Sequence, residues 1–277
     1  MSKLIFFDID GTLINFDGVM PESAVKALRQ AQANGHKIIL CTGRSKCQIE
    51  ERLLNFGFDG MVAAAGAYVE YHDHLINAEY MAADTLTKLV EYFENHSIVY
   101  MIQCSDRIVS TTGSFEGMKQ TFMNRLKDKP KNVNKIFHNQ VEDDDLVHNC
   151  AAYENAEKAC YYLSKVPQEQ VAADLADEFD VISMSFKDCN DSSGEVSQKN
   201  ITKAYGMKKL IDYLGCTIDD TVAFGDGPND FEMIEFAHVG VAMGNANPDL
   251  KEKADMITSH ITEDGIYNGM KELGLIG

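Results

Sequence analysis

Short apolar runs that end abruptly in polar clusters constrain the fold of this chain more than any other feature of its sequence. Five runs share this form, at residues 4–7, 37–40, 60–64, 221–224 and 239–242. Their length and composition are typical of strands buried on both faces. Helical periodicity at 21–34 and 45–56 separates the first three runs, and 231–236 separates the last two. Strands that alternate with helices at both ends of the chain predict a doubly wound, Rossmann-like α/β core with one parallel sheet.

The middle of the chain has a different pattern. The segments 84–95 and 155–164 have helical periodicity. The segments 97–102 and 180–186 alternate like half-exposed strands. A turn-forming cluster at 187–194 precedes a return to helical periodicity at 201–214. We therefore predict a core formed by 1–82 and 191–277, with an α/β domain at 83–190 inserted into it.

The composition restricts the partners of the chain. Its 25 Lys and Arg residues face 43 Asp and Glu residues, a formal net charge of −18. Such a charge disfavours nucleic acids and anionic membranes, which are bound through clustered basic residues. The seven cysteines contain no CxxC pair and are expected to be free thiols. The first residues fit no signal peptide and no apolar run reaches membrane-spanning length, so we expect a cytoplasmic protein.

Two carboxylates follow the first predicted strand. Asp8 and Asp10 are two residues apart in a near-extended segment, so both can face one cavity. One carboxylate could attack phosphorus there while the other moves protons. A strand that simply ends in a turn at Gly11 would explain the same residues without any chemistry.

Two further strand connections carry groups suited to holding a phosphoryl group. Thr42 and Gly43 lie between a strand and a helix, where a hydroxyl and free N–H groups can cradle phosphoryl oxygens. Ser45 as a helix cap after a glycine bend would explain most of this cluster. Lys203, near the start of the helix at 201–214, offers a point charge, although a solvated lysine is the usual interpretation of such a residue.

The last cluster is GDGPND, which follows the strand at 221–224. Asp226 offers the hard carboxylate oxygens that Mg²⁺ prefers. Pro228 at a helix start, with acidic residues in the first turn, is also favourable without any metal. Each cluster has a structural explanation by itself, but all of them fall at strand ends that should border one crevice. Together they predict a phosphoryl-transfer site.

The combined motifs resemble a known family. DIDGT at Asp8, TGR at Thr42, Lys203, GDGPND around Asp226 and VAMGNA at 241–246 resemble the haloacid dehalogenase (HAD) superfamily, specifically its Cof-type phosphatases. The resemblance implies a Mg²⁺-dependent phosphatase that hydrolyses small phosphorylated metabolites, such as sugar phosphates, through an aspartyl-phosphate. It also implies that the inserted segment 83–190 is a cap domain.

The resemblance also implies roles for individual residues. Asp8 would be the nucleophile, and Asp10 would protonate the leaving oxygen and then activate water. Asp8, the backbone carbonyl of Asp10 and Asp226 would hold Mg²⁺, while Asp230 would orient the loop or a water on the metal. The residues expected to grip the phosphoryl group are Thr42, Gly43, Lys203 and Asn229, with Arg44 as a further contact.

The chain departs from the family pattern at two places. Such proteins often have Asn-Gly-Ala after the third strand, where this chain has Ala-Gly-Ala at 65–67 and so lacks an amide side chain close to the crevice that could contact the substrate. Ala204 follows Lys203 where the family usually has glycine. The alternating histidines of His72-Asp73-His74 could bind a metal in principle, but a solvated hairpin turn is the simpler interpretation.

Two other functions use the same motifs. A regulatory module could store a phosphoryl group on Asp8, although storage needs neither the proton-handling Asp10 nor a large cap. A mutase could pass the group to a second sugar hydroxyl, and hydrolysis in labelled water would distinguish it from a phosphatase. The physiological substrate and the oligomeric state are not readable from the sequence.

Overall fold

The computed structural model of the protein describes residues 2–15, 17–125, 139–183 and 192–277, with side chains omitted at 121–125. The chain divides into two compact units, which are described separately. The first contains Met1–Gly43, Glu50–Ala78 and Thr202–Gly277, and the second contains Arg44–Ile49 and Glu79–Ile201. Within the described ranges, no helix is both long enough and apolar enough to cross a lipid bilayer.

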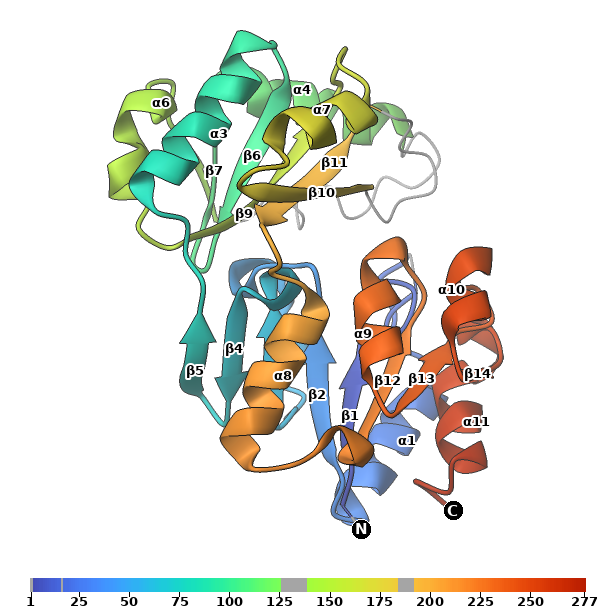
Figure 1. Ribbon diagram of the computed structural model, residues 1–277. Coiled ribbons are helices and arrows are strands. Elements are labelled where there is room, and N and C mark those ends of the chain that lie inside the picture. Colours follow the sequence, from blue (N-terminus) through green and yellow to red (C-terminus); the bar gives the residue numbers. More distant parts are fainter. Residues whose placement is uncertain (1, 16, 126–138, 184–191) are drawn as a thin grey trace. The chain divides into compact units, whose positions relative to one another are not determined.

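The first unit is built on an eight-stranded sheet with the order β14-β13-β12-β1-β2-β3-β4-β5 (Figure 1). Its strands are β1 (Leu4–Phe7), β2 (Lys37–Cys41), β3 (Gly60–Ala63), β4 (Tyr68–Tyr71), β5 (His74–Ala78), β12 (Thr221–Gly225), β13 (Val239–Ala242) and β14 (Met256–Ile257). All pairings from β14 to β3 are parallel, whereas β4 and β5 are added as an antiparallel hairpin. The apolar runs 4–7 and 239–242 match their strands, and the other three runs differ from theirs by one residue.

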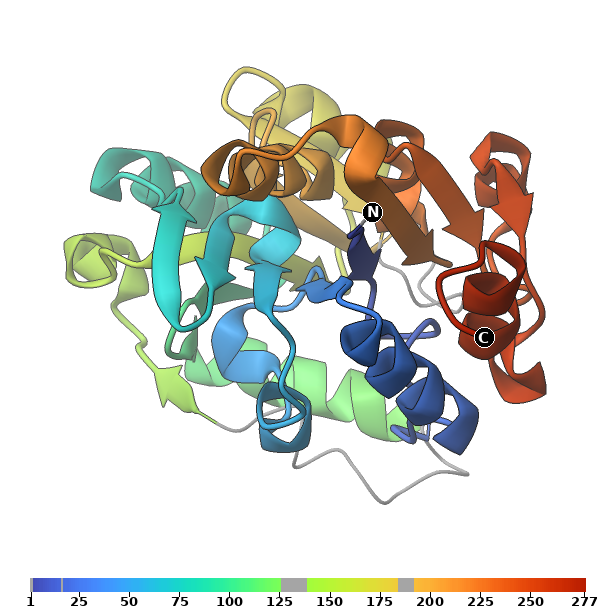
Figure 2. The same ribbon diagram turned by 90° about the horizontal axis from the view of Figure 1, so that it is seen from below.

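Helices cover both faces of this sheet. Figure 2 shows α1 and α11 on one face and α8 and α9 on the other. The helices of the unit are α1 (Glu22–Ala33), α2 (Glu51–Leu54), α8 (Lys203–Leu214), α9 (Phe231–Phe236), α10 (Pro248–Lys253) and α11 (Gly265–Glu272). The buried face of α1 consists mostly of alanines, which lets the helix lie close to the sheet. The predicted doubly wound, Rossmann-like α/β core is confirmed.

Strand order brings the polar strand ends together. β1 lies between β12 and β2, and all three run parallel with Phe7 opposite both Phe224 and Leu40. The residues that follow these strands therefore emerge at the same edge of the sheet. Helix α8 is held close to this edge, because a Cβ on Gly66 would lie 1.9 Å from the carbonyl oxygen of Thr202. The glycine thus permits the contact that places the start of α8.

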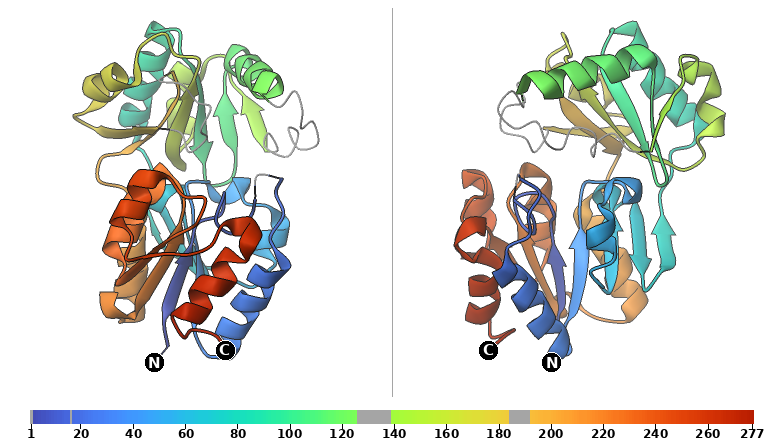
Figure 3. Two further views of the ribbon diagram at one scale, coloured as in Figure 1. Left: turned by 90° about the vertical axis from the view of Figure 1, so that its right-hand side faces the viewer. Right: turned by 180° about the vertical axis from the view of Figure 1, so that it is seen from behind.

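The second unit is built on a six-stranded sheet with the order β10-β11-β9-β6-β7-β8. Its strands are β6 (Val99–Cys104), β7 (Ile108–Ser110), β8 (Gln140–Glu142), β9 (Ala156–Tyr162), β10 (Phe179–Ser183) and β11 (Gly194–Gln198). Its helices are α3 (Ala83–Asn95), α4 (Thr112–Arg125), α6 (Leu146–Asn149) and α7 (Gln168–Leu175). Figure 3 shows α4 on one face of this sheet and α3 and α7 on the other. The larger apolar core lies between the sheet and α3, α6 and α7.

The predicted helix at 155–164 is wrong, because the segment forms strand β9. Ala, Glu and Lys favour helices, but β9 is paired on both edges, with β6 and with β11. Every residue of the strand is buried, including Glu157 and Lys158. Lys158 forms an ion pair with Glu195 of β11, so long-range pairing and a buried polar partner override the local preference.

The predicted continuous helix at 45–56 is also wrong. A short 3₁₀ turn at Lys46–Gln48 and helix α2 are separated by Ile49 and Glu50, which are extended. The backbone N–H of Cys47 donates a hydrogen bond to the carbonyl of Ser105, which fixes the first part of the segment within the second unit. The buried side chain of Ile49 marks the point where the chain leaves that unit.

The bounds of the compact units differ from those of the predicted domains. The second unit extends from Glu79 to Ile201, because β11 pairs with β9 and β10, and it also includes the segment 44–49. The turn cluster predicted at 187–194 lies mostly outside the described residues. His72 and Asp73 form the exposed turn between β4 and β5, with φ of 45° and 62°, as the interpretation of a solvated hairpin requires. All six described cysteines are free thiols, and Cys189 lies outside the described residues.

Candidate active site

Asp8 is the first residue after β1 and is almost completely buried. Its backbone N–H continues the sheet by donating to the carbonyl of Phe224, 3.0 Å away. Oδ1 of its carboxylate accepts a hydrogen bond of 2.6 Å from Nζ of Lys203. Within the described part of the chain, no donor is bonded to Oδ2. One oxygen of Asp8 is therefore held by a cation and the other is available for chemistry.

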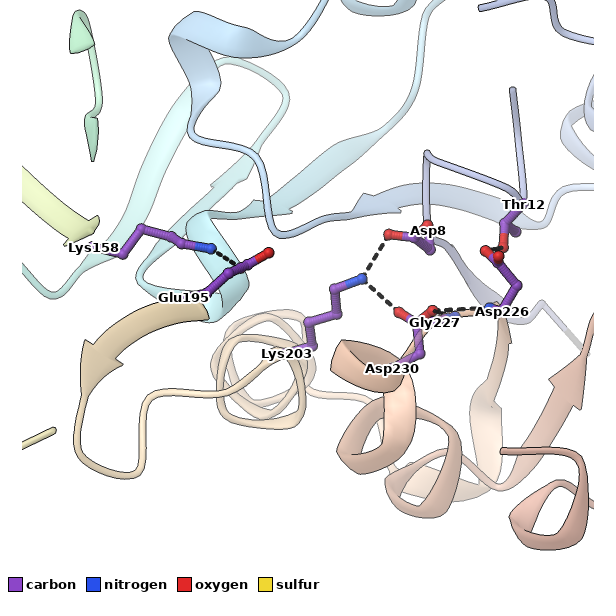
Figure 4. A network of polar contacts seen from close by, with 8 residues as sticks. All are labelled: Asp8, Thr12, Lys158, Glu195, Lys203, Asp226, Gly227 and Asp230. Atoms are coloured by element: carbon purple, nitrogen blue, oxygen red, sulfur yellow. Dashed lines mark hydrogen bonds and ion pairs between the residues drawn. The ribbon is translucent and has the colours of Figure 1, made fainter. Parts of the chain in front are cut away.

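Lys203 begins helix α8 and has a completely buried side chain. Its Nζ also donates to Oδ1 of Asp230, at 2.5 Å, so the ammonium lies between two carboxylates (Figure 4). Burial alone would lower the pKa of Lys203, but Asp230 and Asp8 outweigh this effect and hold its pKa above the ordinary value. The lysine therefore remains charged at any physiological pH.

Asp230 connects Lys203 to the loop after β12. Its Oδ2 accepts hydrogen bonds of 2.9 Å from the backbone N–H groups of Asp226 and Gly227. A Cβ on Gly225 would lie 2.7 Å from Cγ of Asp230, so the loop closes tightly around this carboxylate. Among the described residues, the hydrogen-bond partners of the Asp230 carboxylate are Lys203 and the loop that follows β12. Its role in orienting this loop stays a prediction.

Asp226 is half-buried at the end of β12, and its carboxylate is fixed from the loop after β1. Its Oδ1 accepts a hydrogen bond of 2.9 Å from the hydroxyl of Thr12. Gly11 allows the two loops to approach, because it has a φ of +91° and a Cβ there would lie 2.2 Å from Oδ2 of Asp226. Burial is the largest cause of the raised pKa values of Asp8 and Asp226, and the negative charge of Asp10 makes a smaller contribution to both.

This cluster holds more negative than positive charge. Asp8, Asp226 and Asp230 each offer a carboxylate oxygen, and the three oxygens lie within 4.8 Å of one another, with Lys203 as the neighbouring cation. Burial, and then neighbouring carboxylates, raise the pKa of Asp8 well above its ordinary value, and burial and Asp230 raise the pKa of Asp226 to about 7. A divalent cation would offset this excess charge, and carboxylates are ligands that Mg²⁺ prefers. The residues present therefore fit a metal ion.

The other residues predicted to grip the phosphoryl group lie in two separate segments of the chain. Thr42 follows β2 directly and is buried, with its N–H bonded to Val62 and its carbonyl bonded to Ala65. Gly43 is the next residue, and Asn229 lies in the 3₁₀ turn Pro228–Asp230, which begins two residues after Asp226. The guanidinium of Arg44 donates to the carbonyl of Gln48, and both residues belong to the second unit.

Two residues that contact this cluster were not predicted. Thr12 holds Asp226 as described above. Asn245 donates from its amide nitrogen to the carbonyl of Gly11, at 2.8 Å, and to Oδ2 of Asp226, at 3.4 Å. Thr12 lies inside the motif DIDGT and Asn245 inside VAMGNA. Their position within these motifs was the signal by which the sequence could have identified them as site residues.

Comparisons with known proteins identify the family. The sequence model of the haloacid dehalogenase-like hydrolases matches residues 5–270. The chain belongs to this family. YkrA of Bacillus subtilis, described as a candidate phosphatase, is 34% identical over 280 residues, which cover 99% of this chain and 99% of YkrA.

Two further relatives carry more specific names. The 5-amino-6-(5-phospho-D-ribitylamino)uracil phosphatase YitU of Bacillus subtilis is 27% identical and matches 97% of this chain and 96% of YitU. The solved structure of the HAD subclass IIB sugar phosphatase BT4131 has a TM-score of 0.80 at 27% identity, covering 99% of this chain and 100% of that chain. The chain is therefore a HAD-superfamily phosphatase, an enzyme of phosphoryl transfer, as its motifs predicted.

Proposed function

We propose that this HAD phosphatase hydrolyses small phosphomonoesters in two steps, with Asp8 as nucleophile and Mg²⁺ as cofactor. The observation that carries the proposal is the buried contact between Asp8 and Lys203. The ammonium binds Oδ1 of the carboxylate, and Oδ2 has no bonded donor within the described part of the chain. A carboxylate fixed in this way presents one oxygen in a constant direction, as a nucleophile requires.

In the first step, Oδ2 of Asp8 attacks the phosphorus atom and the bond between phosphorus and the leaving oxygen breaks. Asp10 gives its proton to the leaving oxygen, which departs as an alcohol. Lys203 lies beside the attacking carboxylate and can stabilise the negative charge on the phosphoryl oxygens. Thr42, Gly43 and Asn229 are proposed to hold the same oxygens by hydrogen bonds.

In the second step, water attacks the phosphorus atom of the aspartyl-phosphate. Asp10, now ionised, takes a proton from this water, and the bond between phosphorus and Asp8 breaks. The products are inorganic phosphate and the regenerated carboxylate of Asp8. Asp230 keeps Lys203 in position throughout, because it accepts the second hydrogen bond of the ammonium.

We propose that Mg²⁺ is held by Asp8, Asp226 and the backbone carbonyl of Asp10. Asp230 is the less suitable ligand, since its oxygens already accept bonds from Lys203 and from two backbone N–H groups. When bound, the ion supplies positive charge that lets two anions, carboxylate and phosphate, approach each other. The residues of this chain orient the reactants and transfer the protons.

The proposed substrates are phosphorylated sugars or related small phosphorylated metabolites. The names of BT4131, a sugar phosphatase, and of YitU, which acts on a phosphorylated ribityl compound, support this class. We further propose that the second unit acts as the cap, which selects the leaving group. A nucleic-acid substrate is disfavoured by the net charge of −18.

A panel of phosphomonoesters assayed with Mg²⁺ in ¹⁸O-labelled water tests this proposal. Hydrolysis must release inorganic phosphate that carries the label, and the preferred substrates should be small sugar or polyol phosphates. A mutase would instead return isomerised, unlabelled sugar phosphate. A storage module would form phosphoprotein without turnover. Either of these outcomes would refute the proposed hydrolysis.

A further inference from the structure

Asn245 lies where three separate segments of the first unit meet. It follows β13, in the loop that leads to α10. Its amide nitrogen donates to the carbonyl of Gly11 and to Oδ2 of Asp226, and its amide oxygen accepts a bond of 3.0 Å from the N–H of Ile261. This pattern fixes the orientation of the amide, because a flipped side chain would face a donor with its nitrogen and an acceptor with its oxygen.

The backbone around Asn245 has little freedom. The N–H of Gly244 donates to the carbonyl of Ser259, and a Cβ on Gly244 would lie 2.3 Å from the backbone nitrogen of His260. The N–H of Met243 donates to the carbonyl of Gly225, 3.0 Å away. The loop is thus fastened to two neighbouring segments, and the side chain of Asn245 is presented from a fixed base.

The contacts of Asn245 fall on the proposed metal ligands. Asp226 is held on Oδ1 by Thr12 and on Oδ2 by Asn245, so the direction of its carboxylate is set from both sides. The bond to the carbonyl of Gly11 fixes the Gly11–Thr12 peptide, which is one peptide beyond the Asp10 carbonyl, a proposed ligand. Side chains that orient metal ligands in this way typically contribute about 10–100-fold to metal affinity.

We propose that Asn245 is a positioning residue that orients Asp226 and the Gly11 peptide for the divalent cation. The proposal rests on the proposed function, because it assumes that a metal binds at Asp226. The chemistry needs an asparagine: aspartate cannot donate to Gly11, and the longer glutamine would displace one of the three partners. Asn245 need not touch the substrate to have this effect.

The test is direct binding of Mn²⁺ to the enzyme without substrate, measured by the electron paramagnetic resonance signal of the free ion. Asn245→Ala should raise the Kd for Mn²⁺ by about 10-fold or more, which is the range typical of groups that orient metal ligands. The KM for a substrate at saturating metal should stay unchanged. Asn245→Ser should raise the Kd similarly, because the serine side chain is too short to reach Gly11. This second variant replaces Asn245→Ala in the test if the alanine variant does not fold.

Asn247→Ala is the matched control. Asn247 lies in the same loop and accepts a bond from the N–H of Asp249 as the cap of α10, but its side chain does not contact Asp226. Its loss should lower the melting temperature without changing the Kd for Mn²⁺. An unchanged Kd in both Asn245 variants would overturn the inference. If the wild-type enzyme failed to bind Mn²⁺ at all, the proposed metal site itself would be wrong.

Discussion

Nζ of Lys203 lies 2.6 Å from Oδ1 of Asp8, although 195 positions of sequence separate the two residues. The contact joins the first residue of α8 to the residue that follows β1, and both side chains are removed from water. A buried ion pair is costly to assemble and more costly to leave half-formed. The same ion pair therefore contributes to the stability of the core and holds the proposed nucleophile, Asp8, in position.

Lys203→Met should lower both stability and activity. It leaves the carboxylates of Asp8 and Asp230 buried without their cation, which should reduce the free energy of unfolding by about 3–5 kcal/mol. The loss of one charged donor should reduce kcat by about 10²–10³-fold. Urea unfolding in the presence of a chelator, together with steady-state kinetics, measures both effects.

Lys208→Met is the control for this substitution. Lys208 lies on the same helix and pairs with Asp212 on the surface, where such a pair contributes less than about 1 kcal/mol. Its loss should leave kcat unchanged. If the two variants were equally stable and equally active, the importance of the buried pair would be disproved.

Gly11→Ala should damage the site through a steric clash. Its Cβ would lie 2.2 Å from Oδ2 of Asp226, in addition to the cost of a φ of +91°. Gly35→Ala carries a similar φ of +84° but has no atom within 4 Å of the new Cβ. Both variants should lose about 1–2 kcal/mol from the backbone conformation, but only Gly11→Ala should lose metal binding and turnover. Equal activity of the two variants would contradict the close approach of Gly11 to Asp226.

Glu157→Gln should change the pH dependence of stability. Burial raises the pKa of Glu157 from 4.5 to about 7 in the folded protein, partly opposed by Ser45 and Lys158 and assisted by Asp106. Between pH 4.5, the ordinary pKa that Glu157 has in the unfolded state, and a pH of about 7, the folded state binds more protons than the unfolded state. The free energy of unfolding of the wild type therefore falls as the pH rises through this window.

Glu157→Gln has no carboxyl group to ionise at this position, so its free energy of unfolding lacks this decrease with rising pH. Relative to the wild type, Glu157→Gln should become more stable by up to about 3 kcal/mol between pH 4 and pH 8. Urea unfolding followed by circular dichroism at several pH values measures the difference. A difference that does not vary with pH would show that Glu157 has an ordinary pKa in the folded protein.

Removal of the metal should abolish turnover of p-nitrophenyl phosphate. Mg²⁺ should restore activity and raise the melting temperature, because a ligand of the folded state alone stabilises that state. Ca²⁺ should not restore turnover, since its larger and looser coordination shell would misplace the nucleophile. Asp226→Asn should lose the thermal response to Mg²⁺. Full activity in excess chelator would exclude the proposed cofactor.

The sequence predicted those features that depend on neighbouring residues. Asp8, Thr42 and Asp226 could be assigned to one edge of the sheet because each directly follows an apolar run, and parallel strands end together. The position of Lys203 at the start of α8 was also predictable. Its double contact with Asp8 and Asp230 was not, because it depends on the close approach of Gly66 to the start of α8.

Features that depend on distant segments were missed. Strand β9 contains helix-forming residues, and only its pairing with β6 and β11 makes it a strand. The break at Ile49 depends on contacts of the preceding segment with the second unit. Asn245 contacts Gly11 from 234 positions away, through a loop whose path is set by the backbone of Gly244. The motif VAMGNA draws attention to Asn245, but no local pattern encodes which distant groups it contacts.

The central claim is that Asp8 becomes phosphorylated and that Asp10 controls both proton transfers. Asp8→Asn should form no phospho-enzyme, because a neutral amide is a poor nucleophile. Asp10→Asn keeps the backbone carbonyl proposed as a metal ligand but loses general acid–base catalysis, typically worth about 10²–10⁴-fold. With p-nitrophenyl phosphate, whose leaving group needs little protonation, this variant should be phosphorylated and then stall.

Rapid-quench mass spectrometry of the two variants with p-nitrophenyl phosphate and Mg²⁺ tests this claim most directly. The account predicts that Asp10→Asn accumulates one phosphoryl group on Asp8, located by peptide mapping, whereas Asp8→Asn shows none. A phosphoryl group on Asp8→Asn, or turnover of Asp10→Asn at the wild-type rate, would contradict the assignment of roles to these two aspartates.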